Sequence, residues 1–237
     1  MKFADLIIFE NDDFIIINKP SGISSLHERN QEGDSILELA RTYTDDPQLC
    51  HRLDKETTGA LAIAKNPAAY RHLSMQFENR FVKKKYHAVV EGVVPFKEFK
   101  IDLPILNDGH ETVTIDKRFG KEALTYFTAL KLYKHYTLME CMPVTGRLHQ
   151  IRVHLWSQNA RIVADLKYGG KLPYLSSLKK KFKQGKEVEE ENPIFKRVAL
   201  HARSLHFEAL KGEKVNVEAP YPKDFQVFIK LLDKYDS

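Results

Sequence analysis

Two short apolar runs in the first third of the chain have the length of buried β-strands. Residues 14–17 form a β-branched run that stops at residues 18–22, Asn-Lys-Pro-Ser-Gly. Proline fixes φ and glycine tolerates positive φ, so this cluster predicts a constrained turn directly after a strand. Residues 60–64 form the second run. No run approaches the roughly 20 apolar residues that span a bilayer, which excludes membrane insertion.

Helix signals follow the second run. Asn66 supplies an N-cap, and Pro67 then occupies the first helical position. We expect the helix that follows to bury Tyr70, Leu73 and Phe77.

Two further helices are predicted by apolar spacing. One opens at Thr145–Gly146, and its core stripe at i, i+3 and i+7 consists of Leu148, Ile151 and Leu155. A second stripe of this helix, rotated away from the core and expected to carry charge outward, consists of His149, Arg152 and Trp156. The other helix begins just after Pro222, and its apolar residues at i, i+3, i+4 and i+7 are Phe225, Phe228, Ile229 and Leu232.

The order of elements indicates the fold class. Further strand-like segments lie at residues 86–90, 123–130 and 136–142. Because strands and helices are interspersed without strict alternation, we predict an α+β fold with a mixed, largely antiparallel central sheet and flanking helices and loops. We expect one domain over residues 1–237, with a charged surface insertion at about 167–196, where a lysine run at 179–183 precedes glutamates at 187–191.

Composition and charge narrow the class of protein. With 237 residues, of which 43% are hydrophobic, the chain can bury a sizeable core. Lys plus Arg number 37 and Asp plus Glu 32, so a net charge of +5 permits a polyanionic partner without requiring one. The two cysteines, Cys50 and Cys141, cannot form a disulfide framework or a four-ligand zinc site, and no signal segment begins the chain. These features predict that the protein is located in the reducing cytoplasm.

Candidate chemistry is concentrated just before the second apolar run. His51-Arg-Leu-Asp54 places a carboxylate at the edge of a strand, where it could act as a nucleophile or a base. The alternative is that Asp54 only caps the turn toward Thr57 and Thr58, which is the commoner use of aspartate. His149 and His154 are five residues apart, a spacing that does not set two metal ligands side by side on a helix, so we expect no metal site. Walker, GxGxxG, GxSxG and CxxC motifs are absent from the sequence.

Five groups of residues, taken together and in order, resemble the RluA family of RNA pseudouridine synthases. The groups are Asn18-Lys-Pro-Ser-Gly22; His51-Arg-Leu-Asp54 with Thr58-Gly59 and Ala64-Lys65; Lys85-Tyr86 with Ala88, Val90 and Gly92; Thr145-Gly-Arg147 with His149-Gln-Ile-Arg152 and His154; and Leu200-His-Ala202. They extend over nearly the whole chain. Each is weakly specific alone, whereas the ordered set is strongly specific.

The chain departs from the family pattern at three places. They are residues 23–27 after the first turn, Ala164-Asp165 where the family commonly has Gly-Asp, and Glu208-Ala209 where it has His-Pro. These departures affect the outline of the substrate groove more than the central chemistry. The catalytic segment starts almost at Met1, so we expect no N-terminal small RNA-binding domain of the kind many relatives carry.

The resemblance implies a cofactor-free isomerisation of uridine to pseudouridine. It makes Asp54 the essential carboxylate, Arg152 the cation that pairs with it and lowers its pKa, and Tyr86 the aromatic residue that stacks on the uracil. An ordinary strand tyrosine is the alternative for Tyr86. Whether Asp54 attacks the sugar, attacks the base or removes a ribose proton stays open.

RNA contacts follow from the same chemistry, because a stacked uridine must be flipped out to reach Asp54. We expect Arg52 to enter the vacated space with His51 nearby. Phosphate and backbone contacts are expected from Lys83, Lys84, Arg147 and His149. The lysine run at 179–183 is a further candidate, with a solvated face as the favoured alternative. The expected partner is structured RNA, either transfer RNA or large-subunit (23S) ribosomal RNA, without a required protein partner. A catalytically silent RNA-binding or ribosome-assembly protein of the same fold is the rival function.

Overall fold

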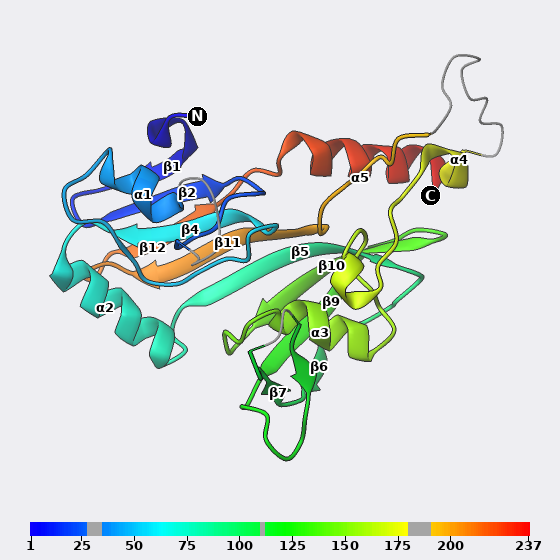
Figure 1. Ribbon diagram of the computed structural model, residues 1–237, viewed down its shortest axis with the longest axis horizontal. Helices are drawn as coiled ribbons and strands as arrows, with labels where there is room; N and C mark the ends of the chain where they lie inside the picture. Colours follow the sequence, from blue (N-terminus) through cyan, green and yellow to red (C-terminus); the bar gives the residue numbers. More distant parts are fainter. Residues whose placement is uncertain (28–34, 110–111, 180–190) are drawn as a thin grey trace. The chain divides into compact units, whose positions relative to one another are not determined.

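A computed structural model describes residues 1–27, 35–109, 112–179 and 191–237 (Figure 1). The chain forms two compact units, each made of two separate stretches of sequence. Unit 1 comprises Met1–Tyr86 and His201–Pro220, and unit 2 comprises His87–Leu200 and Tyr221–Ser237. Two strands, β5 (Lys83–Glu91) and β11 (Leu200–Glu208), contain points at which the chain passes from one unit to the other.

Unit 1 is a sheet with helices on both faces. Its other strands are β1 (Ile7–Glu10), β2 (Phe14–Lys19), β3 (Gln48–Leu49), β4 (Thr58–Ala64) and β12 (Lys214–Glu218). Its helices are the 3-10 turn η1 (Phe3–Leu6), α1 (Ile36–Arg41) and α2 (Pro67–Glu78). The strand order is β1-β2-β4-β11, with β3 paired to β4 and β12 to β11. The β4–β11 pair is parallel, and the other pairs in this unit are antiparallel.

The alternation of side chains in β2 and β4 supplies a core on each face of this sheet. Figure 1 shows α1 and α2 on opposite sides of the strands. On the α2 side, the buried residues include Phe14, Ile16, Ala60, Ala62, Ala64, Ala69 and Leu73. On the α1 side, they include Ile15, Ile17, Ile36, Ala40, Leu61 and Ile63. Since β2 and β4 are covered on both faces, their runs at 14–17 and 60–64 are apolar without interruption, as expected for doubly buried strands.

The first predicted strands and helix are confirmed, with one wrong side chain. Both apolar runs lie in strands, β2 and β4. The Asn66 side chain accepts a hydrogen bond from the Ala69 amide at 2.9 Å, and Pro67 begins α2. Leu73 is buried, but Tyr70 is 38% exposed. Ala69, one position earlier, takes the core-facing place one turn before Leu73, which turns Tyr70 outward.

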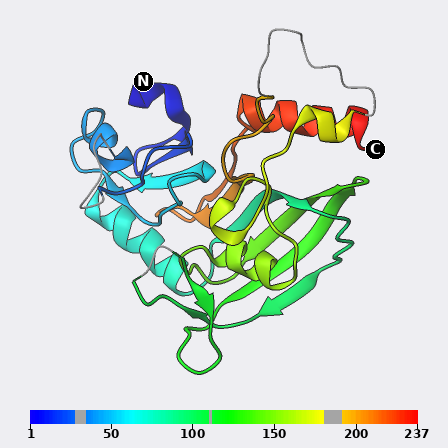
Figure 2. The same ribbon diagram turned by 45° about the vertical axis from the view of Figure 1, so that its right-hand side comes forward.

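Unit 2 contains a second antiparallel group of strands. Next to β5 lie β10 (Tyr136–Pro143), β9 (Leu124–Leu132) and β6 (Phe99–Asp102), in that order, and β7 (Ile105–Leu106) pairs with β8 (Thr114–Ile115). Its helical elements are α3 (Gln150–Ser157), η2 (Leu166–Tyr168), α4 (Leu175–Leu178) and α5 (Lys223–Tyr235). Figure 2 shows α3 lying against β9 and β10. The predicted strands at 86–90, 123–130 and 136–142 are confirmed as β5, β9 and β10.

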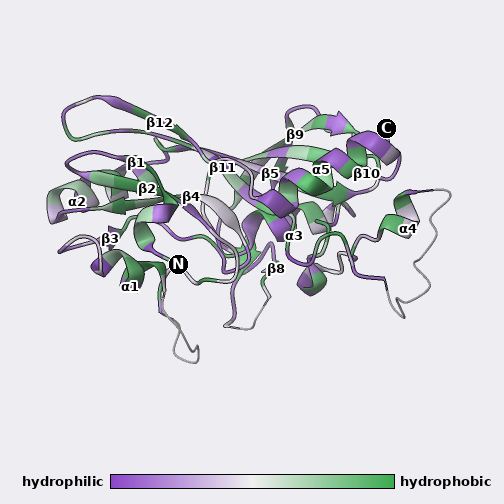
Figure 3. Ribbon diagram, turned by 90° about the horizontal axis from the view of Figure 1, so that it is seen from above, coloured by the Kyte–Doolittle hydropathy of each residue, from purple (hydrophilic) through white to green (hydrophobic). Residues whose placement is uncertain are grey.

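The C-terminal helix is also confirmed. α5 begins directly after Pro222, and Phe225, Phe228 and Leu232 are fully buried. Figure 3 shows hydrophobic and hydrophilic residues side by side along α5, as an amphipathic helix requires. Its C-terminal end is fixed by the buried carboxylate of Asp236, which accepts a hydrogen bond from the amide of His135 at 2.9 Å.

The fold class is the one predicted, a mixed α+β fold with largely antiparallel strands. In the described ranges, no helix combines the length and apolar character that crossing a bilayer requires. The expected surface insertion lies partly outside the described residues, because 180–190 are not described. Of its lysine run, only Lys179 falls within them.

Gly59 lies at a close approach of two backbones in unit 1. It lies at the start of β4 with φ of +114°, beside Ala202 of the parallel strand β11. A β-carbon built at Gly59 would lie 2.2 Å from the carbonyl oxygen of Ala202. Only glycine therefore allows β4 and β11 to pair at this register.

We expect Gly59→Ala to lower the free energy of unfolding by roughly 3 kcal/mol or more, because it adds a steric clash to an unfavourable φ. Gly212→Ala is the matched control: Gly212 has φ of +84° with open space around it, so only the backbone cost of about 1 kcal/mol applies. Urea unfolding of both variants measures the difference. Equal losses would show that the contact with Ala202 is not constraining.

Candidate active site

Asp54 lies in the loop between β3 and β4, and the residue before it is clamped by a serine. The Ser25 hydroxyl donates to the Leu53 carbonyl at 2.8 Å and accepts from the Leu53 amide at 3.0 Å. Leu53 is buried in the core on the α1 side. The Ser25 hydroxyl thus satisfies the backbone amide and carbonyl of Leu53, as a neighbouring strand would. The buried side chain of Leu53 fixes how deeply this part of the loop lies in the core.

The residue after Asp54 is held by a fully buried lysine. The Lys19 ammonium donates to the carbonyl oxygens of Pro20, Ile23 and Lys55 at 2.8, 2.7 and 3.1 Å. The Gly22 amide donates to the same Lys55 carbonyl at 2.9 Å. An ammonium has three donors, and each has a carbonyl here. Hydrogen bonds therefore hold the turn at 18–23 and the backbone on both sides of Asp54 in a fixed arrangement.

The His51 ring anchors the start of this loop. Its Nε2 accepts a hydrogen bond from the Ala62 amide at 3.0 Å, and its ring lies 4.6 Å from that of Phe77, centroid to centroid. Burial, together with the nearby charge of Lys84, lowers the pKa of His51 to about 3. The imidazole is neutral at physiological pH, and its place inside unit 1 makes it a support for the loop.

Tyr86 faces the interior of unit 1 next to Asp54. It packs against the core on the α1 side. Burial and then the negative charge of Asp54 raise the pKa of the Tyr86 phenol well above its ordinary value. The phenol therefore keeps its proton at neutral pH. An aromatic ring beside a carboxylate is the arrangement that the predicted roles of these two residues require.

Lys83 and Lys84 point to different faces of β5, as the alternation of a strand dictates. Lys83 is exposed. Lys84 lies on the same face as Tyr86, with its ammonium 5.8 Å from the ring centroid of Phe77. Burial lowers the pKa of Lys84 to about 8. The two lysines expected to act together on phosphates thus have different environments.

Arg152 is buried in unit 2, and the expectation that its stripe faces outward is wrong for this residue. Its Nε and Nη2 donate to the two carboxylate oxygens of Asp165, both at 2.7 Å. Arg152 is 5% exposed and Asp165 1%. The guanidinium lies 5.1 Å from the ring centroid of Tyr168. Asp165 and Tyr168 hold the planar guanidinium from its edge and its face, which sets its orientation.

The segment that carries Asp165 is shaped by its backbone. Ala164 has φ of +59°, and a β-carbon at Gly170 would lie 2.0 Å from the Ile162 carbonyl oxygen. The Asp165 carbonyl accepts from the amides of Tyr168 and Gly170. This tight turn places Asp165 and Tyr168 on the same side, toward Arg152.

The start of α3 differs from the prediction. The helix begins at Gln150, and His149 precedes it in a left-handed conformation with φ of +51°. The Nδ1 of His149 lies 3.1 Å from the hydroxyl of Tyr168. Thr145 donates to the Gln150 side chain at 2.8 Å, so the residues expected to open the helix form a turn ahead of it.

The remaining candidates are distributed as follows. Arg52 is exposed beside Asp54. Arg147 is exposed, with its Nε donating to the Glu122 carbonyl at 2.9 Å. The ring nitrogens of His154 lie 3.0 Å from the hydroxyl of Thr125 and from the Leu103 carbonyl, which leaves neither for a metal. Asp54 belongs to unit 1 and Arg152 to unit 2. Their pairing stays a prediction.

Three supporting residues were missed by sequence reasoning: Lys19, Ser25 and Asp165. Lys19 ends an apolar strand, and a charge in that position was a usable signal. Ser25 and Asp165 lie in segments where the chain departs from the family pattern. Their partners are backbone atoms or a residue 13 positions away.

Asp165→Ala is expected to lower the free energy of unfolding by about 3–5 kcal/mol, because it removes both carboxylate oxygens from a buried guanidinium. Asp224→Ala is the matched control. Asp224 binds Arg197 in the same two-pronged way at 2.7 and 2.9 Å, but it is 43% exposed, so we expect a loss of about 1 kcal/mol. Urea denaturation compares the two. A smaller loss for Asp165→Ala would contradict the buried-pair interpretation.

A pH prediction follows from His51. The folded state holds this imidazole neutral down to about pH 3, whereas the unfolded chain binds its proton near the ordinary value of 6.5. The stability that His51 contributes is therefore present above pH 6.5 and lost as the pH falls from 6.5 toward 3, by up to about 1.4 kcal/mol per pH unit. His51→Gln should remove this dependence of the free energy of unfolding on pH, whereas His27→Gln, at an exposed position, should retain it. Urea unfolding between pH 6.5 and 4.5 tests this, and equal slopes in all three proteins would refute it.

Comparisons with known proteins identify a family likeness. The sequence profile of the RNA pseudouridylate synthase family matches residues 13–157, which is more than half of the chain. The ribosomal large subunit pseudouridine synthase C of Buchnera aphidicola subsp. Baizongia pistaciae (strain Bp) is 38% identical, over 97% of this chain and 71% of that protein. The ribosomal large subunit pseudouridine synthase D of Neisseria meningitidis serogroup B (strain ATCC BAA-335 / MC58) is 35% identical, over 95% and 60%.

A solved structure extends the likeness to three dimensions. Human RNA pseudouridylate synthase domain containing 4 superposes with a TM-score of 0.75 at 27% identity, covering 98% of this chain and 94% of that one. A family profile that spans Asp54, Tyr86 and Arg152, relatives above 30% identity and a shared fold lead to one conclusion. The chain belongs to the RluA family of RNA pseudouridine synthases, which are isomerases that modify RNA.

Proposed function

We propose that this protein isomerises specific uridines of large-subunit (23S) ribosomal RNA to pseudouridine, with Asp54 as the essential carboxylate. The observation that carries the proposal is the placement of Asp54 between two anchored residues, Leu53 and Lys55, with the ring of Tyr86 close enough for its pKa to respond to the Asp54 charge. A preorganised carboxylate beside an aromatic ring supports a site that holds one uracil.

In the proposed reaction, the bond between N1 of uracil and C1′ of ribose breaks, the base turns, and C5 forms the new bond to C1′. The C5 proton leaves the ring and N1 gains one, so atoms and electrons balance without a cofactor. Asp54 acts as nucleophile or base, and Arg152 is the cation proposed to pair with it. The raised pKa of Tyr86 supports a stacking role over a role as the base that removes the C5 proton.

The RNA contacts are proposed from the exposed cations around these residues. Arg52 is exposed next to Asp54 and fills the space of the flipped uridine. Lys83 and Arg147 contact phosphates, and Lys84 and His149 are assigned secondary contacts because each faces partly inward. His51 acts on RNA only through the loop that it supports. Two free cysteines, Cys50 and Cys141, fit action in the reducing cytoplasm.

Large-subunit ribosomal RNA is the proposed substrate because relatives with 38% and 35% identity are named for that substrate. Transfer RNA is the competing substrate. Mapping pseudouridines in total RNA from cells with and without the gene separates the two.

Asp54→Asn is expected to reduce pseudouridine formation by at least about 1,000-fold, because it removes the charge and the nucleophilic oxygen while keeping the shape. RNA affinity should change little. Asp45→Asn makes the same charge change at an exposed position and should keep full activity. Tritium release from C5-labelled RNA and filter binding measure the two properties. Turnover retained by Asp54→Asn would refute the role of Asp54, whereas a wild-type protein that binds RNA without turnover would favour the silent RNA-binding protein.

A further inference from the structure

A groove in unit 1 lies outside the residues assigned above to catalysis. It has a volume of about 620 Å³ and is formed by the C-terminal half of α2, the segment that leads to β5, and the hairpin of β11 and β12. The lining residues that matter below are His72, Met75, Gln76, Phe81, Lys83 and Lys214. Of these, only Lys83 has a role in the proposed reaction.

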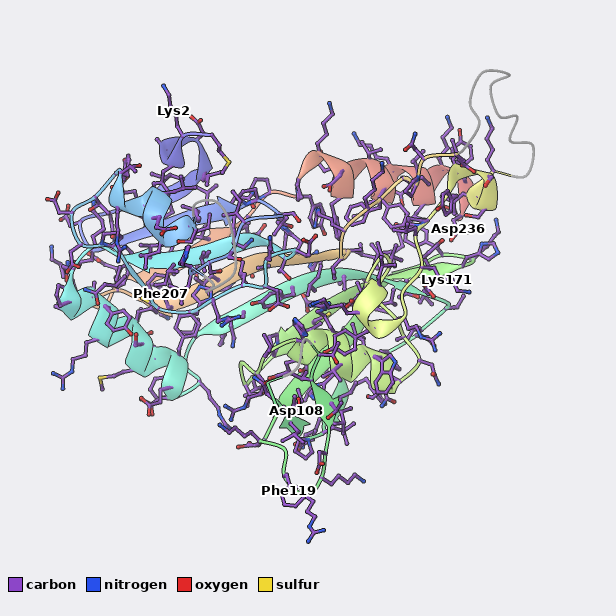
Figure 4. The ribbon with its side chains drawn as sticks, in the orientation of Figure 1. Lys2, Asp108, Phe119, Lys171, Phe207 and Asp236 are labelled. Atoms are coloured by element: carbon purple, nitrogen blue, oxygen red, sulfur yellow. The ribbon has the colours of Figure 1, made fainter. Side chains whose placement is uncertain are left out.

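The floor of the groove is rigid and has its polar groups satisfied. Gln76 exchanges two hydrogen bonds with the backbone of Glu208, at 2.7 and 3.0 Å, and the His72 Nε2 lies 2.9 Å from the same carbonyl. Phe207, labelled in Figure 4, is buried beneath with its ring edge-on to Phe14 at 5.1 Å. These bonds fix the end of β11 to α2, so the groove is already formed before any ligand binds.

The rim carries an aromatic ring that is exposed although its backbone is fixed. Phe81 is 70% exposed. Its amide donates to the Gln76 carbonyl at 2.9 Å, and the Arg80 amide donates to the Phe77 carbonyl at 3.2 Å, with Arg80 at φ of +63°. This pair of bonds is the Schellman motif, which ends a helix in a defined geometry. The motif holds the ring of Phe81 in solvent at a defined place.

Two cations accompany the ring. Lys83 and Lys214 are both exposed, and neither has a carboxylate partner within the described ranges of the chain. Glu208 is the single acidic residue among the lining side chains that the structure describes. An exposed aromatic ring with unpaired lysines is the combination that binds single-stranded nucleic acid, since bases stack on the ring and phosphates attract the ammonium groups.

We propose that this groove is a second RNA site, which holds a single-stranded nucleotide of the substrate away from the target uridine. The base stacks on Phe81, and the flanking phosphates contact Lys83 and Lys214. This inference rests on the proposed action on RNA, and it adds a substrate requirement: an unpaired nucleotide at a fixed distance from the uridine that reacts. A peptide is the competing occupant of the groove. An acidic peptide would contact Lys83 and Lys214 without stacking on the ring of Phe81.

The experiment measures binding of a short oligouridylate by fluorescence anisotropy at several salt concentrations. Phe81→Leu keeps an apolar side chain at the helix end but removes the stacking face, so affinity should fall about ten-fold. Phe81→Trp should keep it. The double variant Lys83→Ala/Lys214→Ala should flatten the slope of log affinity against log salt by about 1.4, which corresponds to two lost phosphate contacts on a single strand.

The matched control for charge is Lys2→Ala/Lys230→Ala, which removes two exposed lysines elsewhere and should leave the slope unchanged. Figure 4 shows Lys2 pointing away from the ribbon. Wild-type affinity for Phe81→Leu would overturn the stacking site, as would an equal change of slope in the control. Competition by polyglutamate as strong as that by oligouridylate would identify an acidic peptide site instead.

The outcome is separable from the test of Asp54, because this assay measures binding and that one measures conversion. If Asp54→Asn keeps turnover while Phe81→Leu loses RNA affinity, the proposed chemistry fails and the groove stands. If Asp54→Asn is inactive and the groove variants bind normally, the reverse holds.

Discussion

The buried ammonium of Lys19 is the interaction on which the candidate site depends. A lysine removed from water costs several kcal/mol unless every donor is satisfied, and here three carbonyls satisfy all three donors. Two of those carbonyls belong to the turn after β2, and the third follows Asp54. The charge therefore holds two segments, more than 30 residues apart in sequence, in one arrangement. Ser25 completes it from the other side of Asp54.

The sequence was most informative about the fold where the apolar pattern and the local helix caps agree. The strands β2 and β4, the start of α2 and the whole of α5 could be predicted because periodicity, Asn66, Pro67 and Pro222 depend only on neighbours in the chain. Tyr70 was predicted buried because an aromatic residue at helical spacing resembles a core position. The choice between Tyr70 and Ala69 depends on how closely α2 approaches the alanines of β4, which is a tertiary property.

The residues of the candidate site likewise fall into those that the sequence revealed and those that it did not. Its principal residues, Asp54, Tyr86 and Arg152, were reached through motif resemblance. The residues that support them were not. Lys19 and Ser25 bind backbone atoms, which carry no sequence signal, so the one usable signal was the charge of Lys19 at the end of an apolar strand. Asp165 reaches Arg152 only through a turn that requires a left-handed Ala164 and a glycine at 170. The burial of Arg152, the late start of α3 and the inward placement of His51 all follow from such contacts.

Because unit 1 is made of two separate stretches of sequence, it cannot be completed until the second stretch has been synthesised. The parallel neighbour of β4 and the hairpin that completes the core on the α2 side belong to His201–Pro220, whereas the rest of unit 1 ends at Tyr86. More than a hundred residues separate these stretches, so a translating ribosome needs on the order of ten seconds to supply the missing piece. During that interval the nascent first unit exposes an unpaired strand edge and an incomplete apolar face, which are the features that chaperones bind.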